Sequence, residues 1–524
     1  MPSVKKRTSR SSPNRNYAFQ CVSNMNTLRH FPLGSRWPDS PHAVISSLPT
    51  MQDVRGYEEH EPRVMKAMQS GYPRFVVHEY VRQLLDFYIE REGLLGRSVV
   101  LVAGERALQD VRDFCGTGVD RVEVDAGVFL LHCDLEDVDL AKKLRKCVQH
   151  IGCSVYSRQA EDLLVKHALK AGLFSEVVAE GNSLQAVRDV LAQQIGCGSS
   201  DVLLTSSGMS AFYAGFRGVQ ALQRGRGRTT WVQLGWLYLD SGCVLKEFLG
   251  EEETLDYSYD VSDVDAIIEQ LRTYGDSLAA VVLEYPSNPL LQTCEVHRIA
   301  AAVREFGGVM VIDPSIASVF NVDVLPHADL LVTSLTKYAA VEGDVMSGAI
   351  AVNPTSPYYG ELAARVADNH SPAYGRDIAR LGHEIETAPQ AVAQMSLNAS
   401  RLHAYLAQHP RVKKIYFAGS SKHMGAIAQE QGSIGAVISV ELQGDMEAFY
   451  DAVKVMKGPS FGTQFTLLCP FMYLAHYDLV TTDVGRTFLA EVGIAPELIR
   501  ISVGTEPYEA IEAVFAEALD RNAV

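Results

Sequence analysis

The sequence predicts an α/β fold built on a mostly parallel sheet. Short apolar runs alternate with helical segments, and the strand candidates are 201–205, 230–234, 279–283, 309–312, 330–332 and 348–352. Alternating strands and helices indicate a parallel sheet covered by helices on both faces. A second observation is that Gly208, Asn288, Asp313 and Lys337 each follow a strand end. Since ligands of such sheets bind beyond the carboxyl ends of the strands, we expect these residues to form one site.

Four segments are expected along the chain. Residues 1–78 form an N-terminal arm with a loop around Tyr72, and residues 79–182 form an α/β insert. A large domain follows over 183–385, and a smaller C-terminal α+β domain covers 386–524. Residues 1–16 are rich in Lys, Arg and Ser without any acid, which is typical of a disordered tail and also of transit peptides. The insert shows no catalytic grouping, so packing or regulation is its expected role.

Composition excludes several classes of protein. The 524 residues can bury a large core, and the net charge of −16 argues against nucleic-acid binding. No apolar run reaches the roughly 18–20 residues that span a bilayer. The nine cysteines are scattered without a C-x-x-C pair, which favours reduced thiols and a cytoplasmic protein. No cluster of His and Cys predicts a metal site.

Lys337 directly follows an apolar strand, in the run Ser334-Leu335-Thr336-Lys337-Tyr338. A desolvated lysine has a lowered pKa, and its neutral amine forms a Schiff base with an aldehyde. The hydroxyls of Ser334 and Thr336 suit a phosphate, and Asp313 ends another apolar strand. An aldehyde and a phosphate on one small molecule point to pyridoxal 5′-phosphate (PLP), which needs a lysine and an acid for its ring nitrogen. Taken alone, Lys337 would more often be a surface lysine, and its neighbours reverse that interpretation.

Two further patterns suit anions. Gly208 and Met209 open a helix directly after a strand, where free backbone N–H groups and the helix dipole favour an anion. The serines around them are also ordinary helix caps. Arg500 alternates with Ile on a predicted strand near the C-terminus. It suits either a solvated face or a clamp for a carboxylate, and the residues alone leave both open.

The motifs together resemble one family. Glu284-Tyr285-Pro286-Ser287-Asn288-Pro289 is similar to an E-x-P-S-N-P element, and the run 334–338 is similar to an S-x-T-K-Y signature. Over 183–524 the chain resembles the γ-subfamily of fold-type I PLP enzymes, the Cys/Met-metabolism group of cystathionine γ-synthases, lyases and sulfhydrylases. The resemblance implies a fold-type I PLP-dependent transferase. Together with the N-terminal arm, the insert is similar to that of the longer, fungal-type cystathionine γ-synthases.

The resemblance implies a role for each matching residue. Lys337, Asp313 and Tyr72 are the catalytic candidates, with Lys337 as the Schiff-base lysine and proton carrier and Asp313 as the partner of the ring nitrogen. The remaining candidates are Asn288 at the phenolic oxygen of PLP, Gly208, Met209, Ser334 and Thr336 at its phosphate, and Arg500 with Ser460 at the carboxylate of the substrate.

Two implications concern neighbouring groups. Tyr72 and Arg74 match a Y-x-R element that reaches the phosphate of the neighbouring subunit's cofactor, which implies a homodimer or homotetramer. The family's ring-stacking tyrosine is replaced in the run Leu234-Gly235-Trp236-Leu237-Tyr238. Trp236 is a candidate for that stacking role, and core packing is an equal alternative.

The implied reaction is replacement of the acyl group of an O-acylhomoserine by L-cysteine, which gives cystathionine for methionine biosynthesis. The alternatives are an O-acylhomoserine sulfhydrylase or a cystathionine or methionine lyase on the same scaffold. A PLP-binding regulatory protein without activity is a third alternative, against which the set of Lys337, Asp313 and Arg500 argues. All of these would act on or bind small amino acids, without nucleic acid, membrane or metal.

Overall fold

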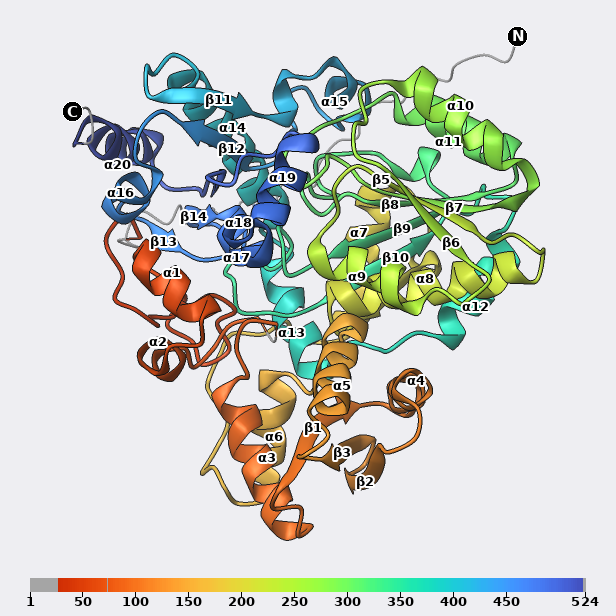
Figure 1. Cartoon of the computed structure of the whole chain (residues 1–524). Helices are drawn as coiled ribbons and strands as arrows, with labels where there is room; N and C mark the ends of the chain where they lie inside the picture. Colours follow the sequence, from red (N-terminus) through yellow and green to blue (C-terminus); the bar gives the residue numbers. More distant parts are fainter. Residues whose placement is uncertain (1–26, 73, 522–524) are drawn as a thin grey trace.

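The computed structural model describes residues 27–72 and 74–521, so the predicted tail over residues 1–16 lies outside the described residues. Three sheets occur in this part of the chain, one each within the predicted segments 79–182, 183–385 and 386–524. Figure 1 shows the insert below the other two parts, with the large sheet to the right and the C-terminal sheet to the upper left. The boundaries between these segments stay a prediction.

The large sheet has, in the described residues, seven strands and is mostly parallel, as predicted. Only β10 runs antiparallel, and it lies between β4 and β9. The order across the sheet is β4 (Val202–Thr205), β10 (Gly348–Val352), β9 (Leu330–Ser334), β8 (Val309–Asp313), β7 (Leu278–Glu284), β5 (Thr230–Leu234) and β6 (Thr254–Ser258).

Helices cover both faces of this sheet. Side chains on the two faces of its buried strands therefore pack into two different hydrophobic cores. On β7, Val281 and Leu283 pack into one core with α10 and α11, whereas Ala280 and Val282 pack into another with α8. The helices of this part are α7 (Ser183–Ile195), α8 (Gly208–Arg224), α9 (Leu239–Phe248), α10 (Val264–Tyr274), α11 (Val296–Glu305), α12 (Tyr359–Asp368) and α13 (Gly375–Glu384).

The C-terminal part is α+β, with a sheet ordered β11-β12-β15-β14-β13 in which only β13 and β14 pair in parallel. Its strands are β11 (Val412–Tyr416), β12 (Val437–Leu442), β13 (Met456–Lys457), β14 (Leu467–Pro470) and β15 (Ile499–Ser502). Its helices are α14 (Ala388–Leu406), α15 (Lys422–Ile427), α16 (Met446–Ala452), α17 (Phe471–Ala475), α18 (Tyr477–Thr481), α19 (Asp483–Glu491) and α20 (Tyr508–Arg521).

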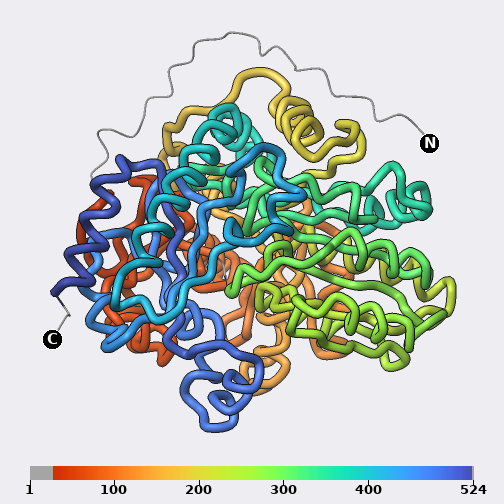
Figure 2. The backbone as a smooth tube through the Cα atoms, turned by 90° about the horizontal axis from the view of Figure 1, so that it is seen from above, coloured from red at the N-terminus to blue at the C-terminus, as the bar shows by residue number. Residues whose placement is uncertain are grey.

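The N-terminal arm lies against the C-terminal part. It contains two short helices, α1 (Met51–Glu58) and α2 (Pro62–Ala67). Met51 and Val54 share a core with Phe449 and Tyr450. Figure 2 shows this arm, in red, beside the C-terminal segments in blue. The arm is therefore held by apolar burial before the chain reaches the Tyr72 loop.

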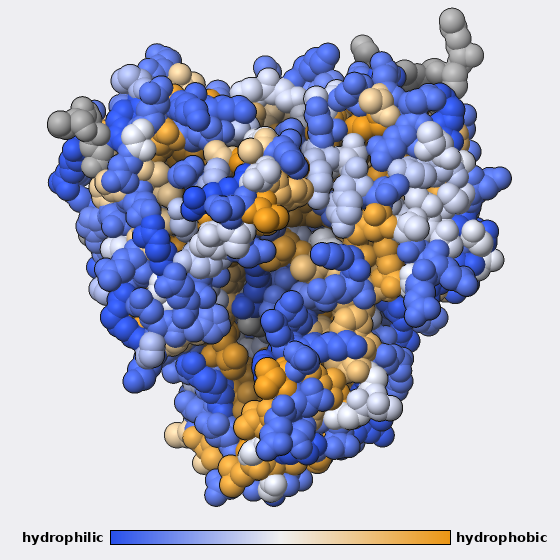
Figure 3. All heavy atoms as spheres, in the orientation of Figure 1, coloured by the Kyte–Doolittle hydropathy of each residue, from blue (hydrophilic) through white to orange (hydrophobic). Residues whose placement is uncertain are grey.

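The insert forms an antiparallel sheet ordered β1-β3-β2 with helices around it. Its elements are α3 (Glu79–Arg91), β1 (Arg97–Ala103), α4 (Glu105–Cys115), β2 (Asp120–Asp125), β3 (Val128–Asp134), α5 (Val138–Ile151) and α6 (Ser157–Lys166). Cys147 and Ile151 of α5 pack with Phe212 and Tyr213 of α8 in one core. The insert therefore shares a core with the large domain. Leu95, Leu135 and Val138 of the insert are exposed apolar side chains. Figure 3 shows apolar surface at the bottom of the molecule, where the insert lies.

Buried charges also join the insert to the large domain. The fully buried Arg158 of α6 lies 3.0 Å from a carboxylate oxygen of Asp377 in α13 and donates to the backbone oxygen of Asp344 at 2.7 Å. It also pairs with Glu176 at 2.7 Å. Among the described residues, no helix is both long and apolar enough to cross a membrane.

Candidate active site

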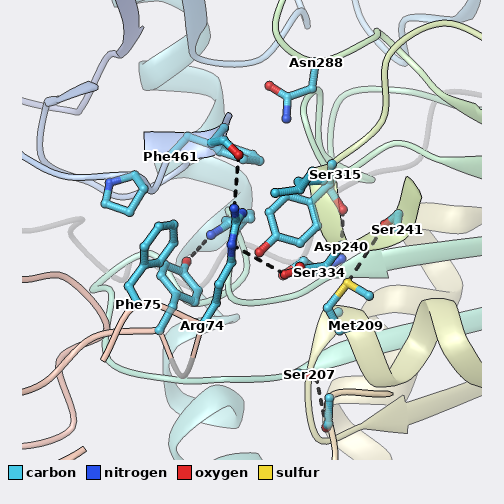
Figure 4. A pocket seen from close by; sticks show the side chains of 18 of the residues that line it. Arg74, Phe75, Ser207, Met209, Asp240, Ser241, Asn288, Ser315, Ser334 and Phe461 are labelled. Carbon is cyan, nitrogen blue, oxygen red and sulfur yellow. Dashed lines mark hydrogen bonds and ion pairs between the residues drawn. The ribbon is translucent and has the colours of Figure 1, made fainter. Parts of the chain in front are cut away.

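A pocket lies where the carboxyl ends of the parallel strands meet the C-terminal part and the insert. Most of the predicted site residues line it, and Figure 4 shows several of them pointing into it. The lining includes Tyr72, Arg74, Gly208, Met209, Asn288, Asp313, Ser334, Lys337 and Arg500. The predicted strand-end residues lie together, because β7, β8 and β9 end side by side in the sheet.

Lys337 follows β9 and contacts two hydroxyl groups. Its amine nitrogen donates a hydrogen bond to the hydroxyl of Tyr72 and another, of 3.2 Å, to the hydroxyl of Ser460. The hydroxyls of Tyr72 and Ser460 are themselves 2.9 Å apart. Desolvation, and secondly the positive charge of Arg500, hold the pKa of Lys337 well below its usual value. A lowered pKa favours the neutral, nucleophilic form of the amine.

Asp313 ends β8 and lies beside a second carboxyl group. Its side chain accepts hydrogen bonds from the backbone N–H of Ser315 at 2.8 Å and from the Ser315 hydroxyl at 2.6 Å. Desolvation raises the pKa of Asp313 to about 6. Glu284 pairs with Asp313 across β7 and β8, and burial followed by repulsion from Asp313 raises the pKa of Glu284 well above its usual value. A positively charged N–H group placed beside Asp313 would pair with its carboxylate.

The turn after β4 has the geometry of an anion site. The hydroxyl of Ser207 caps α8 by accepting from the backbone N–H of Ser210 at 3.1 Å. A Cβ atom on Gly208 would lie 2.7 Å from the Cβ atom of Ser334, so only glycine allows these two segments to approach so closely. The N-terminus of α8 and the hydroxyl of Ser334 thus face the same space, with the helix dipole favouring an anion.

Arg500 reaches the pocket from β15. Its guanidinium donates to the side-chain oxygen of Asn288 at 3.0 Å and to the backbone oxygen of Pro459 at 2.9 Å. The rings of Phe461 and Phe471 lie 5.0 and 4.8 Å from its central carbon. Its Nε atom is buried and has no hydrogen-bond partner in the described part of the chain. A buried, unpaired donor on a fixed guanidinium fits a bound carboxylate.

Tyr72 and Arg74 lie in the pocket of their own chain. The nearest carboxylate to Arg74 is Asp240, whose oxygen is 3.9 Å from Nε of Arg74, and the two side chains are labelled in Figure 4. Arg74 also donates to the backbone oxygen of Ala475 at 3.3 Å. The resemblance implies that both residues serve a neighbouring subunit, and this stays a prediction; within the single chain described here both line the pocket.

Three predicted residues lie outside the pocket lining, namely Ser460, Thr336 and Trp236, of which Ser460 still contacts the amine of Lys337. The hydroxyl of Thr336 donates to the backbone oxygen of Ser347 at 3.3 Å and accepts from its N–H at 3.1 Å. Thr336 is thus bonded to the neighbouring backbone, whereas Ser334 faces the pocket. Trp236 packs in a core against Tyr259 and His476, with ring centroids 5.3 and 5.4 Å away. The core-packing alternative for Trp236 therefore describes its position.

Comparison with known proteins gives the family. The family model for "Cys/Met metabolism PLP-dependent enzyme" matches residues 183–520. The chain is 33% identical to the L-2-amino-4-chloropent-4-enoate dechlorinase/desaturase of Streptantibioticus cattleyicolor, over 92% of this chain and 97% of that protein. It is 32% identical to the cystathionine gamma-synthase of Neurospora crassa, over 61% of this chain and 52% of that protein.

Solved structures share the fold. A cystathionine gamma synthase of Xanthomonas oryzae, in complex with aminoacrylate and cysteine, is similar with a TM-score of 0.55 and 23% identity. The similarity covers 66% of this chain and 86% of that chain. The chain belongs to the Cys/Met-metabolism family of PLP-dependent enzymes.

The pocket of this family member fits the family's cofactor. The close approach of Gly208 to Ser334 leaves backbone N–H groups for a phosphate, and the desolvated carboxyl of Asp313 suits a ring N–H. Lys337 supplies the amine for an aldehyde, as the prediction of PLP requires. When bound, PLP supplies the electron sink that stabilises negative charge on a substrate carbon.

Several lining residues were missed by the sequence analysis. Glu284 stood in a quoted motif without a role, and Tyr238 and Asp240 follow β5 at the same sheet edge as the predicted residues. Their position after a strand was the available signal. Gln149, Gly152 and Tyr156 of the insert had no such signal, because their segment precedes the large domain and only tertiary packing brings them to the pocket.

Proposed function

We propose that this enzyme removes a leaving group from the γ-carbon of an L-amino acid. The observation that carries the proposal is the contact of Lys337 with the hydroxyls of Tyr72 and Ser460, beside Arg500 with its unpaired Nε. An α-carboxylate at Arg500 would place the α- and β-carbons of a substrate toward the lysine. The amine and the phenol then offer two groups for the proton transfers that departure of a γ-substituent requires.

Each residue of the site has its own role in this reaction. Arg500 binds and orients the substrate carboxylate through charge-assisted hydrogen bonds. The amine of Lys337, whose pKa is lowered by desolvation, accepts a proton from the α-carbon of the substrate and can return a proton to a neighbouring carbon. The phenol of Tyr72, with desolvation raising its pKa, stays protonated and can donate to the lysine or to a leaving group. The aromatic rings of Phe461 and Phe471 exclude water around the guanidinium.

The first candidate reaction is the synthesis of cystathionine. The sulfur of L-cysteine would replace the acyl group of an O-acylhomoserine, with one C–O bond broken and one C–S bond formed. The motifs around Asn288 and Lys337 and the similarity to the Neurospora crassa cystathionine gamma-synthase support it. A cytoplasmic place in methionine biosynthesis would follow, and a methionine requirement of a deletion strain would test that role.

The second candidate is elimination without a replacing nucleophile. The dechlorinase/desaturase relative is similar over 97% of its length, which includes the insert, and its named substrate carries chlorine on the γ-carbon. An apolar pocket wall formed by Phe75, Phe461, Phe471 and Leu474 suits a halogen better than a polar ester. Loss of HCl from a γ-chloro amino acid would use the same proton transfers.

One set of incubations separates the candidates. The purified enzyme with PLP is incubated with O-acetyl- or O-succinylhomoserine, with and without cysteine, and with L-2-amino-4-chloropent-4-enoate. Cystathionine formed only with cysteine supports the synthase, and 2-oxobutyrate without cysteine supports a lyase. Release of chloride supports the elimination. Failure of all three substrates to react, with cofactor bound at Lys337, would contradict the γ-carbon proposal.

A further inference from the structure

A second cavity lies between the insert and the large domain, where α4 approaches α8 and α12 (Figure 1). Its volume is about 250 Å³, whereas one water molecule needs only roughly 10–15 Å³ of such space. Four arginines from these three helices line it: Arg106 of α4, Arg217 and Arg224 of α8, and Arg365 of α12. The described residues that line this cavity are all different from those of the active-site pocket.

Helices α8 and α12 are in close contact beside the cavity. A Cβ atom on Gly218 of α8 would lie 2.7 Å from a methyl carbon of Val366 in α12 and 3.2 Å from its backbone nitrogen. Arg217 and Arg365 are the residues that directly precede the two residues in contact. Arg224 follows Arg217 by seven residues, which places both on one face of α8. The backbone segments that carry these arginines are therefore held at a fixed spacing.

Three of the four guanidinium groups share one arrangement, in which Nε and Nη2 donate to a neighbouring carboxylate. The pairs are Arg106 with Asp110, Arg224 with Glu253 and Arg365 with Glu361. The distances are 3.1 and 2.8 Å for Arg106, and 3.2 and 2.8 Å for Arg365. Within the described part of the chain, Nη1 of each of these arginines has no hydrogen-bond partner. The carboxylates thus orient the planar groups and leave one donor nitrogen of each for a ligand.

Arg217 differs from the other three arginines, because no carboxylate of the described residues lies within 4 Å of its guanidinium group. Its Nη1 donates to the side-chain oxygen of Gln220 at 2.7 Å, and Nε and Nη2 have no partner in the described residues. The partner carboxylates of the other arginines are not among the lining residues, and Asp368 is the one acid that is. The wall of the cavity therefore presents mainly positive charge and unused N–H groups.

We propose that this cavity binds a compact anion with two or more phosphate or carboxylate groups. Guanidinium groups donate paired hydrogen bonds to both kinds of group, and four of them disfavour a neutral or cationic ligand. A bound anion would join α4 of the insert to α8 and α12 of the large domain. Helix α8 begins at Gly208 in the active site and ends 17 residues later at this cavity, about 25 Å along its axis. The site therefore suits an effector rather than a substrate, and it does not depend on the reaction proposed above.

Isothermal titration calorimetry of the full-length, PLP-bound enzyme tests the site with tripolyphosphate, pyrophosphate and citrate. The buffer is free of phosphate, and the bound PLP keeps these probes out of the cofactor site. We expect one tripolyphosphate per chain, with an affinity that falls as salt is added. Tighter binding of the two phosphate probes than of citrate supports a phosphate ligand, and the reverse order supports a carboxylate ligand. Failure of all three probes to bind would overturn the proposal.

Substitution of Arg217 locates the bound probe. The variant Arg217→Gln removes the guanidinium that has no carboxylate partner, so it leaves no carboxylate unpaired. We expect it to weaken tripolyphosphate binding at least about tenfold, because charge-assisted hydrogen bonds are lost. The control Arg82→Gln removes an exposed arginine of α3 and should leave the affinity unchanged.

Should Arg217→Gln fail to fold, Arg365→Gln carries the same expectation, since its pair with Glu361 lies at the surface. Binding as tight in these variants as in the wild type would place the probe elsewhere, for example at Arg500, and would overturn the proposal. An equal loss of affinity in the Arg82→Gln control would overturn it as well, because the attraction would then come from the overall charge of the protein.

Discussion

Arg500 has one guanidinium nitrogen in use at Asn288, one at Pro459 and an unpaired Nε. The substitution Arg500→Lys keeps the charge but replaces the planar fork by a single ammonium group. We expect the KM for the amino-acid substrate to rise about 10- to 100-fold, since a charge-assisted hydrogen bond contributes about 1.5–3 kcal/mol. The kcat should change far less. Steady-state kinetics, or titration of the cofactor absorbance with substrate, measures this.

A matched control for that variant is Arg401→Lys. Arg401 is exposed, pairs with Glu509 at 2.8 Å and lies over the ring of Tyr508 far from the pocket. Its replacement should leave both KM and kcat unchanged. Equal effects of the two substitutions would contradict a carboxylate-binding role for Arg500.

Asp313 predicts a pH dependence of stability for the cofactor-free protein. Desolvation raises its folded-state pKa from 3.8 to about 6, so in that window the folded protein holds a proton that the unfolded chain has lost. Stability from this group is therefore lost as the pH rises from 3.8 to about 6. The variant Asp313→Asn lacks this dependence. The difference in unfolding free energy between wild type and variant should fall by up to about 3 kcal/mol across the window.

Urea unfolding of both cofactor-free proteins at several pH values measures this difference. Because Asp313 contributes to the raised pKa of Glu284, the difference between the two proteins includes the coupling of these two carboxyl groups. Parallel stability profiles for wild type and variant would contradict the raised pKa of Asp313.

Helix α8 is the element that brings the anion turn to the pocket, and its first residue is Gly208. In Gly208→Ala the new Cβ atom would lie 2.7 Å from the Cβ atom of Ser334, so the start of the helix must move away from β9. We expect the dissociation constant of PLP to rise roughly 10- to 100-fold, since overpacking costs about 1–3 kcal/mol. Fluorescence or absorbance titration of the cofactor-free protein measures the change.

Gly360→Ala is the control for Gly208→Ala. Gly360 lies in the first turn of α12, and a Cβ atom added there would meet no other atom within 4 Å. The substitution should leave cofactor affinity unchanged and stabilise the helix by up to about 1 kcal/mol. A loss of affinity in this variant as well would show that the effect at Gly208 is not local.

The sequence predicted the strands correctly where they are buried, because a buried strand is a run of apolar residues. β7, β8 and β9 are buried runs, and their expected ranges match the structure within a residue or two. Strand β6 was missed, because it lies at the sheet edge and its sequence Thr-Leu-Asp-Tyr-Ser carries little apolar signal. Helix α9 was missed as well, although its start places Asp240 at the pocket.

At the scale of the whole molecule, the buried Arg158 holds the insert on the large domain. In Arg158→Met the buried carboxylate of Asp377 loses its arginine partner, and Glu176 keeps only Arg376. We expect a loss of about 3–5 kcal/mol in unfolding free energy, because one member of a buried ion network is left uncompensated.

The control is Arg298→Met, whose partners Asp265 and Glu295 lie at the surface. Its removal should cost less than about 1 kcal/mol. Thermal and urea unfolding of both variants gives the comparison. An Arg158→Met protein as stable as the wild type would contradict the anchoring role of the network.

The sequence by itself determined the family, the cofactor and the mostly parallel sheet. Short motifs sufficed for this, because Lys337, Asp313 and Asn288 each follow a strand end, and strand order in such a fold brings those ends together. The sequence also identified Tyr72, Arg74 and Arg500, which reach the pocket from outside the large sheet.

Only the tertiary structure decided which side chains face the pocket. Thr336 and Trp236 differ from their lining neighbours by the direction of the side chain, which depends on packing rather than on local sequence. The same holds for Gly152 and Tyr156, far from the catalytic motifs along the chain. Their contact with α8 arises because α5 and α8 bury apolar surface against each other. This packing joins segments that are far apart in the sequence, so no short motif predicts it.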